Sequence, residues 1–298
     1  MDISFELYKV FYYVAAKLSF SEASKDLFIS QSAVSQSIRT LEKKLGHPLF
    51  IRSTKKVQLT PEGELLLRHI EPAVHLILQG EQQLSQTPAL SGQLRIGASD
   101  TICRYFLVPY LKRFHEEFPQ VHIKVTNQTS LGCVELLENS QVDLIVVNSP
   151  NTRLKTIKNQ LIINEFQDVF ATNPRFFKPE KEPLTLEDLQ KLPILMLNRR
   201  STTSLFLHQL FEEHRLSLIP EVELSSNDLL IDFARIGLGV AFVPDYMLSE
   251  NDKDLIPLKL KTPIPSRSLI LAYSDQLPNT WAANEFIHYF LSDDKRDL

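Results

Sequence analysis

Apolar residues in the first ninety positions recur with the period of α-helices, and short polar breaks separate one helix from the next. Residues 19–45 predict two helices joined by a very short turn. Ser19 and Glu22 have the spacing of a capping box, which satisfies free amides at a helix start. Ser30 is a good cap for the second helix, which carries one continuous apolar stripe. That stripe consists of Val34, Ile38, Leu41 and Leu45.

The opposite face of this second helix carries hydrogen-bonding side chains and no acid. Its members are Gln31, Ser32, Ser35, Gln36 and Arg39. Small hydroxyls, amides and a guanidinium on one helix can present donors and acceptors to base edges in the DNA major groove. The alternative is a helical hairpin with an ordinary solvated face, since helix pairs with short turns are common.

The residues after Gly46 favour the DNA-binding interpretation. A basic, hairpin-like segment contains Arg52, Lys55 and Lys56, and Pro61 then opens another helix. A recognition helix followed by a basic wing is a winged helix-turn-helix arrangement, with the wing suited to phosphate contacts. The charge agrees: residues 17–60 hold eight bases and three acids, a balance of +5, so the rest of this chain of net charge -4 carries -9.

These residues resemble the amino-terminal signature of LysR-type transcriptional regulators. The matching positions are Ala23, Leu27, Ser30-Gln31, Ala33, Ser35, Ile38, Leu41-Glu42, Leu45-Gly46, Leu49-Phe50, Arg52, Leu59-Thr60 and Gly63. Two positions depart from the family: Ser32 replaces the usual proline, and Gln36 stands where arginine is frequent. Because glutamine prefers adenine edges and arginine prefers guanine, we expect the bases that are read to differ from those of better-known relatives.

A long helix is expected from Pro61 to about Gln86. Apolar or small residues recur in it with a period of 3.5, which is typical of a helix that pairs with another helix. They are Leu66, Ile70, Ala73, Ile77, Gly80 and Leu84. By the resemblance this is the linker helix that forms the dimer. Pro72 inside it is expected to kink the helix or to cost a hydrogen bond, and residues 85–92 form a plausible hinge.

Strand and helix patterns alternate from Gln93 onward, which implies parallel sheets with helices on their faces. Strands are expected at 93–98, 121–126, 142–147, 160–172, 194–197 and 221–224, with a further buried strand ending at Pro244. Helices are expected at residues up to 118, and at 130–139, 185–190, 202–214, 229–236 and 280–291.

The resemblance implies three parts for the whole chain. Residues 1–60 form the winged helix-turn-helix domain, residues 61–91 the linker helix and hinge, and residues 92–298 an effector-binding α/β domain. That last part is expected to resemble a type II periplasmic binding protein. Subdomain I would hold about 92–161 and 266–298, and subdomain II about 162–265, with the chain crossing near 159–163 and 263–269.

Polar side chains follow several of the predicted strands, where a ligand lies in open α/β sheets. They are Ser99, Asp100, Thr101, Thr129, Ser130, Asn148, Asn198, Ser201 and Thr202. Several precede helices, so backbone amides and helix dipoles would favour an anion, and Arg153, Arg199 and Arg200 would add positive charge near the mouth. We therefore expect a small metabolite carboxylate, although Asp100 argues against a polyanion. The alternative for each residue is a simple helix cap.

The expected function is ligand-responsive transcription regulation. The partners would be double-stranded DNA with an imperfect palindrome, half-sites about 10 base pairs apart, a second or further copies in a homodimer or homotetramer, and RNA polymerase as a further candidate. The alternative is an enzyme or solute-binding protein that uses the same cleft, with the amino-terminal helices serving only assembly. The sequence has no glycine-rich phosphate loop, metal-ligand spacing or nucleophile elbow, so no catalytic residue, metal or cofactor is expected.

The sequence gives no sign of a membrane partner or of export. The longest early apolar run, residues 10–16, is too short to span a bilayer, and the first residues lack a basic signal-peptide region, so a cytoplasmic location is expected. Cys103 and Cys133 do not make a disulfide framework. Buried free thiols are the favoured interpretation, with a redox pair left open.

Overall fold

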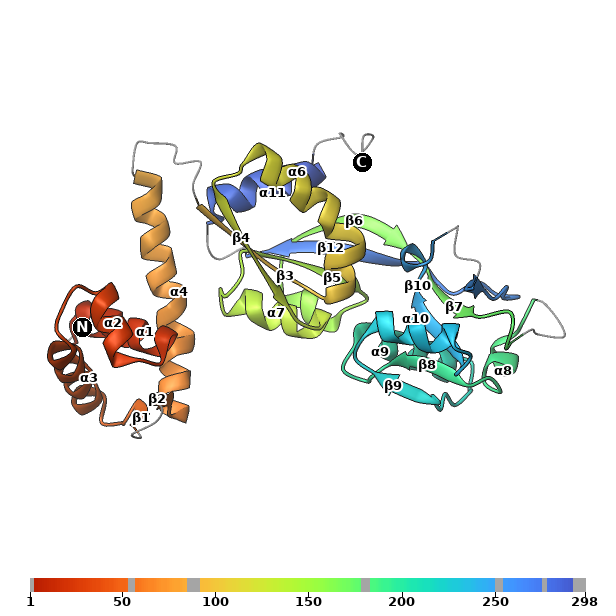
Figure 1. The fold of residues 1–298 in the computed structure, drawn as a ribbon, viewed down its shortest axis with the longest axis horizontal. Helices are drawn as coiled ribbons and strands as arrows, with labels where there is room; N and C mark the ends of the chain where they lie inside the picture. Colours follow the sequence, from red (N-terminus) through yellow and green to blue (C-terminus); the bar gives the residue numbers. More distant parts are fainter. Residues whose placement is uncertain are drawn as a thin grey trace. The chain divides into compact units, whose positions relative to one another are not determined.

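The structure is a computed structural model and describes residues 3–52, 57–84, 92–177, 183–249, 254–274 and 278–291. Two compact units make up the chain: a smaller amino-terminal unit that ends with a long helix, and a larger carboxy-terminal unit (Figure 1). Among the described residues, none of the helices combines the length and the apolar character needed to span a membrane.

The amino-terminal unit is a three-helix domain with a small hairpin and a long fourth helix. Its elements are α1 (Phe5–Lys17), α2 (Phe20–Asp26), α3 (Gln31–Leu45), β1 (Phe50–Arg52), β2 (Val57–Leu59) and α4 (Pro61–Leu84). The predicted helix pair is confirmed, and its caps explain where the helices begin. Ser19 Oγ accepts a hydrogen bond from the Glu22 amide at 3.2 Å, and Ser30 Oγ accepts one from the Ala33 amide at 3.2 Å. The helix-turn-helix fold therefore rests on local signals.

The core of this unit lies behind α3. Val34, Ile38 and Leu41 are fully buried there, and Phe11 and Val14 of α1 pack against them. The predicted apolar stripe thus faces the core, except that Leu45 is only partly buried. Burial of such side chains stabilises each by about 1.5–3 kcal/mol relative to exposure, which is enough to fix the rotation of α3.

Helix α4 begins at a cap and runs without a break through Pro72 to Leu84. Thr60 Oγ1 accepts a hydrogen bond from the Gly63 amide at 3.0 Å, as expected for a helix start. The predicted stripe divides into two parts: Leu66 and Ile70 pack against the three-helix core, whereas Ile77 is 43% exposed. The predicted end at Gln86 lies outside the described residues.

The carboxy-terminal unit contains two five-stranded sheets. The first has the strand order β4-β3-β5-β12-β6, and its helices lie on both faces, with α6 and α11 on one side and α7 on the other (Figure 1). Its elements are β3 (Gly92–Ala98), α5 (Asp100–Ile102), η1 (Cys103–Leu107), α6 (Val108–Glu117), β4 (Val121–Asn127), α7 (Ser130–Glu138), β5 (Leu144–Ser149), η2 (Thr152–Thr156), β6 (Asn159–Phe166), β12 (Arg267–Tyr273) and α11 (Trp281–Leu291).

The second sheet has the order β11-β7-β10-β8-β9. Its elements are β7 (Asp168–Thr172), α8 (Leu186–Leu189), β8 (Ile194–Leu197), α9 (Thr202–Glu213), β9 (Val222–Leu224), α10 (Asn227–Arg235), β10 (Val240–Pro244), η3 (Asp245–Met247) and β11 (Ile256–Pro257). Side chains of α9 form one apolar cluster with the sheet, and side chains of α10 form another. The helices and strands predicted for residues 185–244 are present, within a few residues at their ends. The strand predicted over residues 160–172 is instead two strands, β6 and β7, which belong to different sheets.

The expectation of parallel sheets is wrong for part of each sheet. The pairs β3–β4, β3–β5, β8–β9 and β8–β10 are parallel, but β12 runs antiparallel to both neighbours, and β7 runs antiparallel to β10. Strand β12 also went unrecognised as a strand. The rule of alternation applies to strands joined by crossover helices, whereas β6, β7 and β12 carry the chain directly between the two sheets.

Candidate functional site

The outer face of α3 presents the five side chains that the sequence singled out. Gln31, Ser32, Gln36 and Arg39 are exposed, and Ser35 is half-buried. Ser32 Oγ lies 2.9 Å from the capping Ser30 Oγ. The first turn of α3 holds no acid, and its last turn holds two lysines. This surface therefore offers hydrogen-bonding groups and positive charge without an opposing carboxylate at its start.

The hairpin after α3 is described only in part. Arg52 ends β1, which pairs antiparallel with β2. Lys55 and Lys56 lie outside the described residues. The Glu42 carboxylate accepts hydrogen bonds from the Leu49 and Phe50 amides at 2.8 and 3.3 Å, which ties the start of the hairpin to α3.

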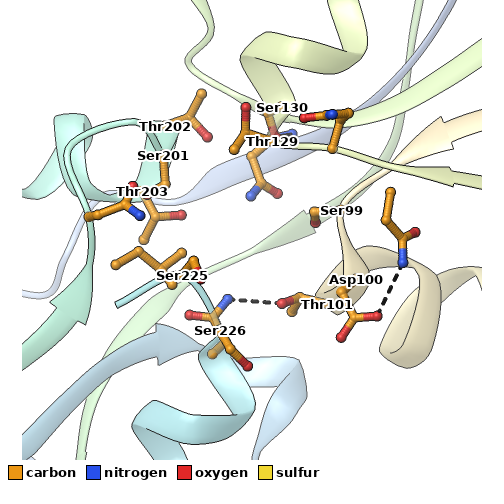
Figure 2. A pocket seen from close by; sticks show the side chains of 16 residues that line it. Ser99, Asp100, Thr101, Thr129, Ser130, Ser201, Thr202, Thr203, Ser225 and Ser226 are labelled. Carbon is orange, nitrogen blue, oxygen red and sulfur yellow. Dashed lines mark hydrogen bonds between the residues drawn. The ribbon is translucent and has the colours of Figure 1, made fainter. Parts of the chain in front are cut away.

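All nine strand-end residues predicted for the effector site line one pocket of the carboxy-terminal unit, with a volume of about 260 Å³ (Figure 2). They reach it from the ends of β3, β4, β5 and β8 and from the starts of the helices that follow. Residues 99–101 and 129–130 belong to segments of the first sheet, and residues 198–202 to the second. The pocket is therefore assembled from both sheets, which is where open α/β folds bind ligands.

Seven further residues, which were not predicted from the sequence, complete the lining of the pocket: Asn127, Gln128, Leu197, Thr203, Ser225, Ser226 and Asn227. The signal for the last three was present. They follow a predicted strand and precede a predicted helix, which is the pattern that singled out the other groups. Asn227 Nδ2 donates a hydrogen bond to Thr101 Oγ1 at 3.0 Å, so this segment joins the two halves of the pocket.

None of the three arginines expected near the mouth belongs to the pocket lining. Arg199 and Arg200 are exposed and do not belong to the lining, and Arg153 pairs with Glu135 on α7. Asp100 is the one charged side chain among the lining residues.

Eight hydroxyl groups of the lining accept a hydrogen bond from an N–H group of the protein. They belong to Ser99, Thr101, Thr129, Ser130, Ser201, Thr202, Thr203 and Ser226. Four of them cap helix starts, as the simple alternative proposed. A hydroxyl that accepts one bond still has its own hydrogen to donate. Capping and ligand binding are therefore compatible at these positions.

Three helices of eight residues or more begin at the pocket: α7 after Thr129, α9 after Ser201 and α10 after Ser226. The start of a helix carries unpaired amides and a partial positive charge, which attracts anions. These helix starts thus place partial positive charges at the pocket, and Asp100 is the single carboxylate in its lining.

A buried arginine that the sequence analysis missed lies behind two threonines of the pocket. Arg267 Nη1 donates to Asp168 Oδ2 at 2.6 Å and to Thr203 Oγ1 at 3.0 Å, and Nη2 donates to Thr202 Oγ1 at 3.5 Å. Its Nε donates to the Ser149 carbonyl at 3.0 Å, at the end of β5. The side chains of Arg267 and Asp168 are both 0% exposed. Its signal in the sequence is an arginine at the start of a mostly apolar segment, residues 267–273.

This ion pair connects the strands on which the chain crosses between the sheets. Asp168 begins β7 and Arg267 begins β12. Burial raises the pKa of the Asp168 carboxyl, and the neighbouring guanidinium opposes that shift. The pair therefore holds the hydroxyls of Thr202 and Thr203 in place from behind.

The two cysteines are free thiols. Burial raises the pKa of the Cys103 thiol to about 11 and that of Cys133 to about 12. The thiolate is the reactive form, so both groups are poorly reactive near neutral pH. Within the described ranges no three His, Cys, Asp or Glu side chains are grouped as metal ligands.

Comparison with known proteins accounts for both units. The model for the bacterial regulatory helix-turn-helix protein, lysR family, matches residues 5–64, and that for the LysR substrate binding domain matches residues 88–294. The HTH-type transcriptional activator IlvY of Salmonella typhimurium is 28% identical over 276 residues, which cover 90% of this chain and 88% of that protein.

Two solved structures share the fold. A full-length variant of OxyR from Pseudomonas aeruginosa has a TM-score of 0.76 at 20% identity, with 97% of this chain and 95% of that chain covered. The CcmR regulatory domain of Synechocystis, in complex with 2-PG, has a TM-score of 0.62 at 19% identity, with 70% and 99% covered. With its helix-turn-helix unit and its effector-binding unit, the chain belongs to the LysR family of transcriptional regulators.

Proposed function

We propose that this regulator senses a small carboxylate in the pocket formed by the nine predicted strand-end residues. The observation that carries the proposal is that these residues, separated by up to about a hundred positions in sequence, line one cavity with helix starts and hydroxyl groups around it. Neutral donors and helix dipoles are suited to a carboxylate. The CcmR regulatory domain, which shares this fold, was solved with 2-PG, so a small ligand in such a domain has a precedent.

We propose that the outer face of α3 reads base edges and that the wing contacts phosphates. The base-reading residues would be Gln31, Ser32, Ser35, Gln36 and Arg39, and the phosphate contacts Arg52, Lys55 and Lys56. The functional parts would be residues 1–60 for DNA binding, 61–91 for the linker and hinge, and 92–298 for the effector. Exposed groups on α3 and a basic wing support this division of roles.

The active form we propose is a homodimer or homotetramer on an imperfect palindrome, with half-sites about one helical turn, roughly 10 base pairs, apart. Its support is the second part of α4, where Leu76, Ile77 and Leu78 are 37%, 43% and 42% exposed. An apolar helix surface of this kind pairs with another helix. RNA polymerase would be a further partner of the DNA-bound form.

The proposed mechanism is a shift between two arrangements of the dimer. A ligand that binds one arrangement more tightly shifts the population toward it, by no more than its difference in affinity for the two. The change would reach DNA as an altered spacing or bend of the two half-sites.

The experiment combines DNA selection with ligand binding on the full-length protein. Fragments of the protein's own genome are selected at modest ionic strength and footprinted, and small carboxylates are screened by thermal shift, since a bound ligand stabilises by mass action. We expect a palindromic footprint that changes when a stabilising acid is added. Failure to prefer any fragment, with or without these acids, would falsify the proposal.

The Ser130→Ala variant tests the pocket itself. It removes a hydroxyl that is 4% exposed and lies at the start of α7, so the ligand response should be lost while DNA binding persists. The matched control is Gln209→Ala on the exposed side of α9, where the side chain contacts Glu213, and both ligand and DNA binding should remain. A normal ligand response in Ser130→Ala would remove the pocket from the mechanism.

A further inference from the structure

We infer that the ligand of this pocket is a small acid with a single negative charge that also carries a hydroxyl or ammonium group as a hydrogen-bond donor. The inference rests on the proposed function of the pocket as the effector site and makes its ligand class narrower. Three properties of the lining support it: its charge, its supply of donors and its unpaired acceptors.

The charge of the lining limits the ligand to one negative charge. Asp100 is the single ionisable group among the 16 lining residues, and none of them is a lysine, arginine or histidine. A bound dianion, such as a phosphate ester or a dicarboxylate, would lose hydration without gaining an ionic partner, and it would face the Asp100 carboxylate. Neutral donors and three helix starts can compensate one charge.

Four of the eight bonded hydroxyls of the lining lie toward one end of the pocket. In Figure 2, Thr129, Ser130, Ser201 and Thr202 lie together at the top of the view. Their oxygens accept bonds from the Gly132, Asn148 and Ser204 amides and from Arg267, which leaves their hydrogens for a ligand. The α7 and α9 helices start at the same end. The geometry assigns this end to the carboxylate.

Two buried amide oxygens of the lining have no hydrogen-bond partner among the described residues, which favours a ligand that carries a hydrogen-bond donor. Asn227 is 6% exposed and its Nδ2 is bonded to Thr101, while its Oδ1 is buried and has no hydrogen-bond partner among the described residues. Asn148 Oδ1, on another lining residue, is also buried and has no hydrogen-bond partner among the described residues. Buried acceptors without partners are destabilising, and a ligand that donates to them relieves the cost.

The Asp100 carboxylate also favours a ligand that carries a hydrogen-bond donor. It lies with Thr101 and Ser226 at the lower end of the view in Figure 2, away from the group of four hydroxyls. One Asp100 oxygen accepts a bond from Asn127 Nδ2 at 3.4 Å. A hydroxyl or ammonium on the ligand would have the Asp100 carboxylate as an acceptor at this end, whereas a plain hydrocarbon would offer that carboxylate no donor.

A set of four-carbon acids separates these possibilities by calorimetric titration of the full-length protein. Butyrate has no second donor, 2- and 4-hydroxybutyrate add a hydroxyl at either end, 2- and 4-aminobutyrate add an ammonium, and succinate adds a second negative charge. We expect at least one hydroxy or amino acid to bind about tenfold more tightly than butyrate, since one hydrogen bond to a buried acceptor has that worth. Succinate should bind more weakly than that acid by a similar factor. The hydroxy and amino arms distinguish the two kinds of donor.

Two variants connect the preferences to the residues. Asn227→Ala should reduce the advantage of the donor-bearing acid over butyrate, and Asp100→Asn should reduce the penalty on succinate. Asp232→Ala is the control, because this side chain is exposed on the same helix α10 and pairs with Arg235; it should leave all preferences unchanged.

The outcomes separate this inference from the proposed function. If butyrate and succinate bind as tightly as every substituted acid, and Ser130→Ala still abolishes binding, the pocket is the effector site but the inference is overturned. If none of the six acids binds, this inference is overturned, and the wider thermal-shift screen decides the proposed function. If Ser130→Ala leaves the binding of these acids unchanged, both proposals are overturned.

Discussion

The outer face of α3, which we propose to read DNA, and the pocket of the carboxy-terminal unit are built in opposite ways. The face comes from one run of nine residues, Gln31 to Arg39, on a single helix, and most of its side chains are exposed. The pocket comes from 16 residues on separate segments, and eight of its hydroxyls are bonded to protein N–H groups. On the outer face of α3, the groups that could bind a partner are thus separate from the residues that hold the fold together. In the pocket, the same groups also take part in the hydrogen bonds of the fold.

This difference predicts how substitutions behave. Exposed side chains away from caps and cores change stability by about 0.5 kcal/mol or less. Changes on the α3 face should therefore alter DNA binding and leave folding alone. Changes at the pocket should alter ligand binding and stability together, because the same oxygen caps a helix or holds a neighbouring group.

The largest effect is expected at Arg267. Arg267→Leu leaves the Asp168 carboxylate buried without its partner and removes two donors behind the pocket, so the carboxy-terminal unit should lose about 3–5 kcal/mol of stability. Chemical denaturation with a probe in that unit measures it. The double variant Arg267→Met with Asp168→Leu should recover most of the loss, because it leaves no unpaired charge.

The exposed Arg200→Leu serves as the control and should change stability by less than about 0.5 kcal/mol. A loss below about 1 kcal/mol in Arg267→Leu would mean that solvent or another group compensates Asp168. The pocket would then depend less on the buried pair of Arg267 and Asp168 than we expect.

A smaller effect is expected behind the recognition face, at Gly63. A Cβ at this position would lie 2.2 Å from the Leu49 carbonyl oxygen, so Gly63→Ala must move backbone, and we expect a loss of about 1–3 kcal/mol in thermal or chemical unfolding of the amino-terminal unit. Gly80→Ala is the matched control on the same helix, since its Cβ would meet nothing within 4 Å.

Because alanine favours a helix interior over glycine, Gly80→Ala should stabilise by about 0.5–1 kcal/mol. Equal effects of the two changes would show that the close approach at Leu49 is not what makes Gly63 sensitive. The expected contrast would place the sensitive positions of this unit in its packing, away from the outer face of α3.

The sequence predicted the amino-terminal unit well because its signals are local. Ser19 and Ser30 cap helices a few residues away, and the apolar stripe of α3 follows one helical period. It also placed nine pocket residues together, since strand ends followed by helix starts are recognisable one segment at a time. Each of these inferences needs only a short window of sequence.

What the sequence did not predict depends on distant segments. Strand β12 pairs with β5 and β6, which precede it by about a hundred residues. No pattern within residues 267–273 predicts these partners or the antiparallel direction of the pairing. The pair of Arg267 with Asp168 is a contact of the same kind. Arg199 and Arg200 stand between two lining residues, Asn198 and Ser201, without belonging to the lining, and the sequence of this turn does not distinguish the four positions.

The smallest effect on folding, and the sharpest on function, is expected for Gln36→Ala. Gln36 is exposed on α3, so unfolding should change by less than about 0.5 kcal/mol, while discrimination at one base pair should fall by about 1–3 kcal/mol. Selection of DNA sequences by the full-length variant measures this loss position by position. The same change at exposed Gln209, on α9, should leave the DNA preference as it was.

A uniform loss across all sequences would assign Gln36 to the DNA backbone, because phosphate contacts carry no sequence information. An unchanged preference would remove it from the contact surface, and a large loss of stability would show that the α3 face is tied to the fold as the pocket is. We expect a relaxed base preference at a single position with unaltered folding. That result would require both that exposed side chains of α3 contact the bases and that a separate core holds the helix in place.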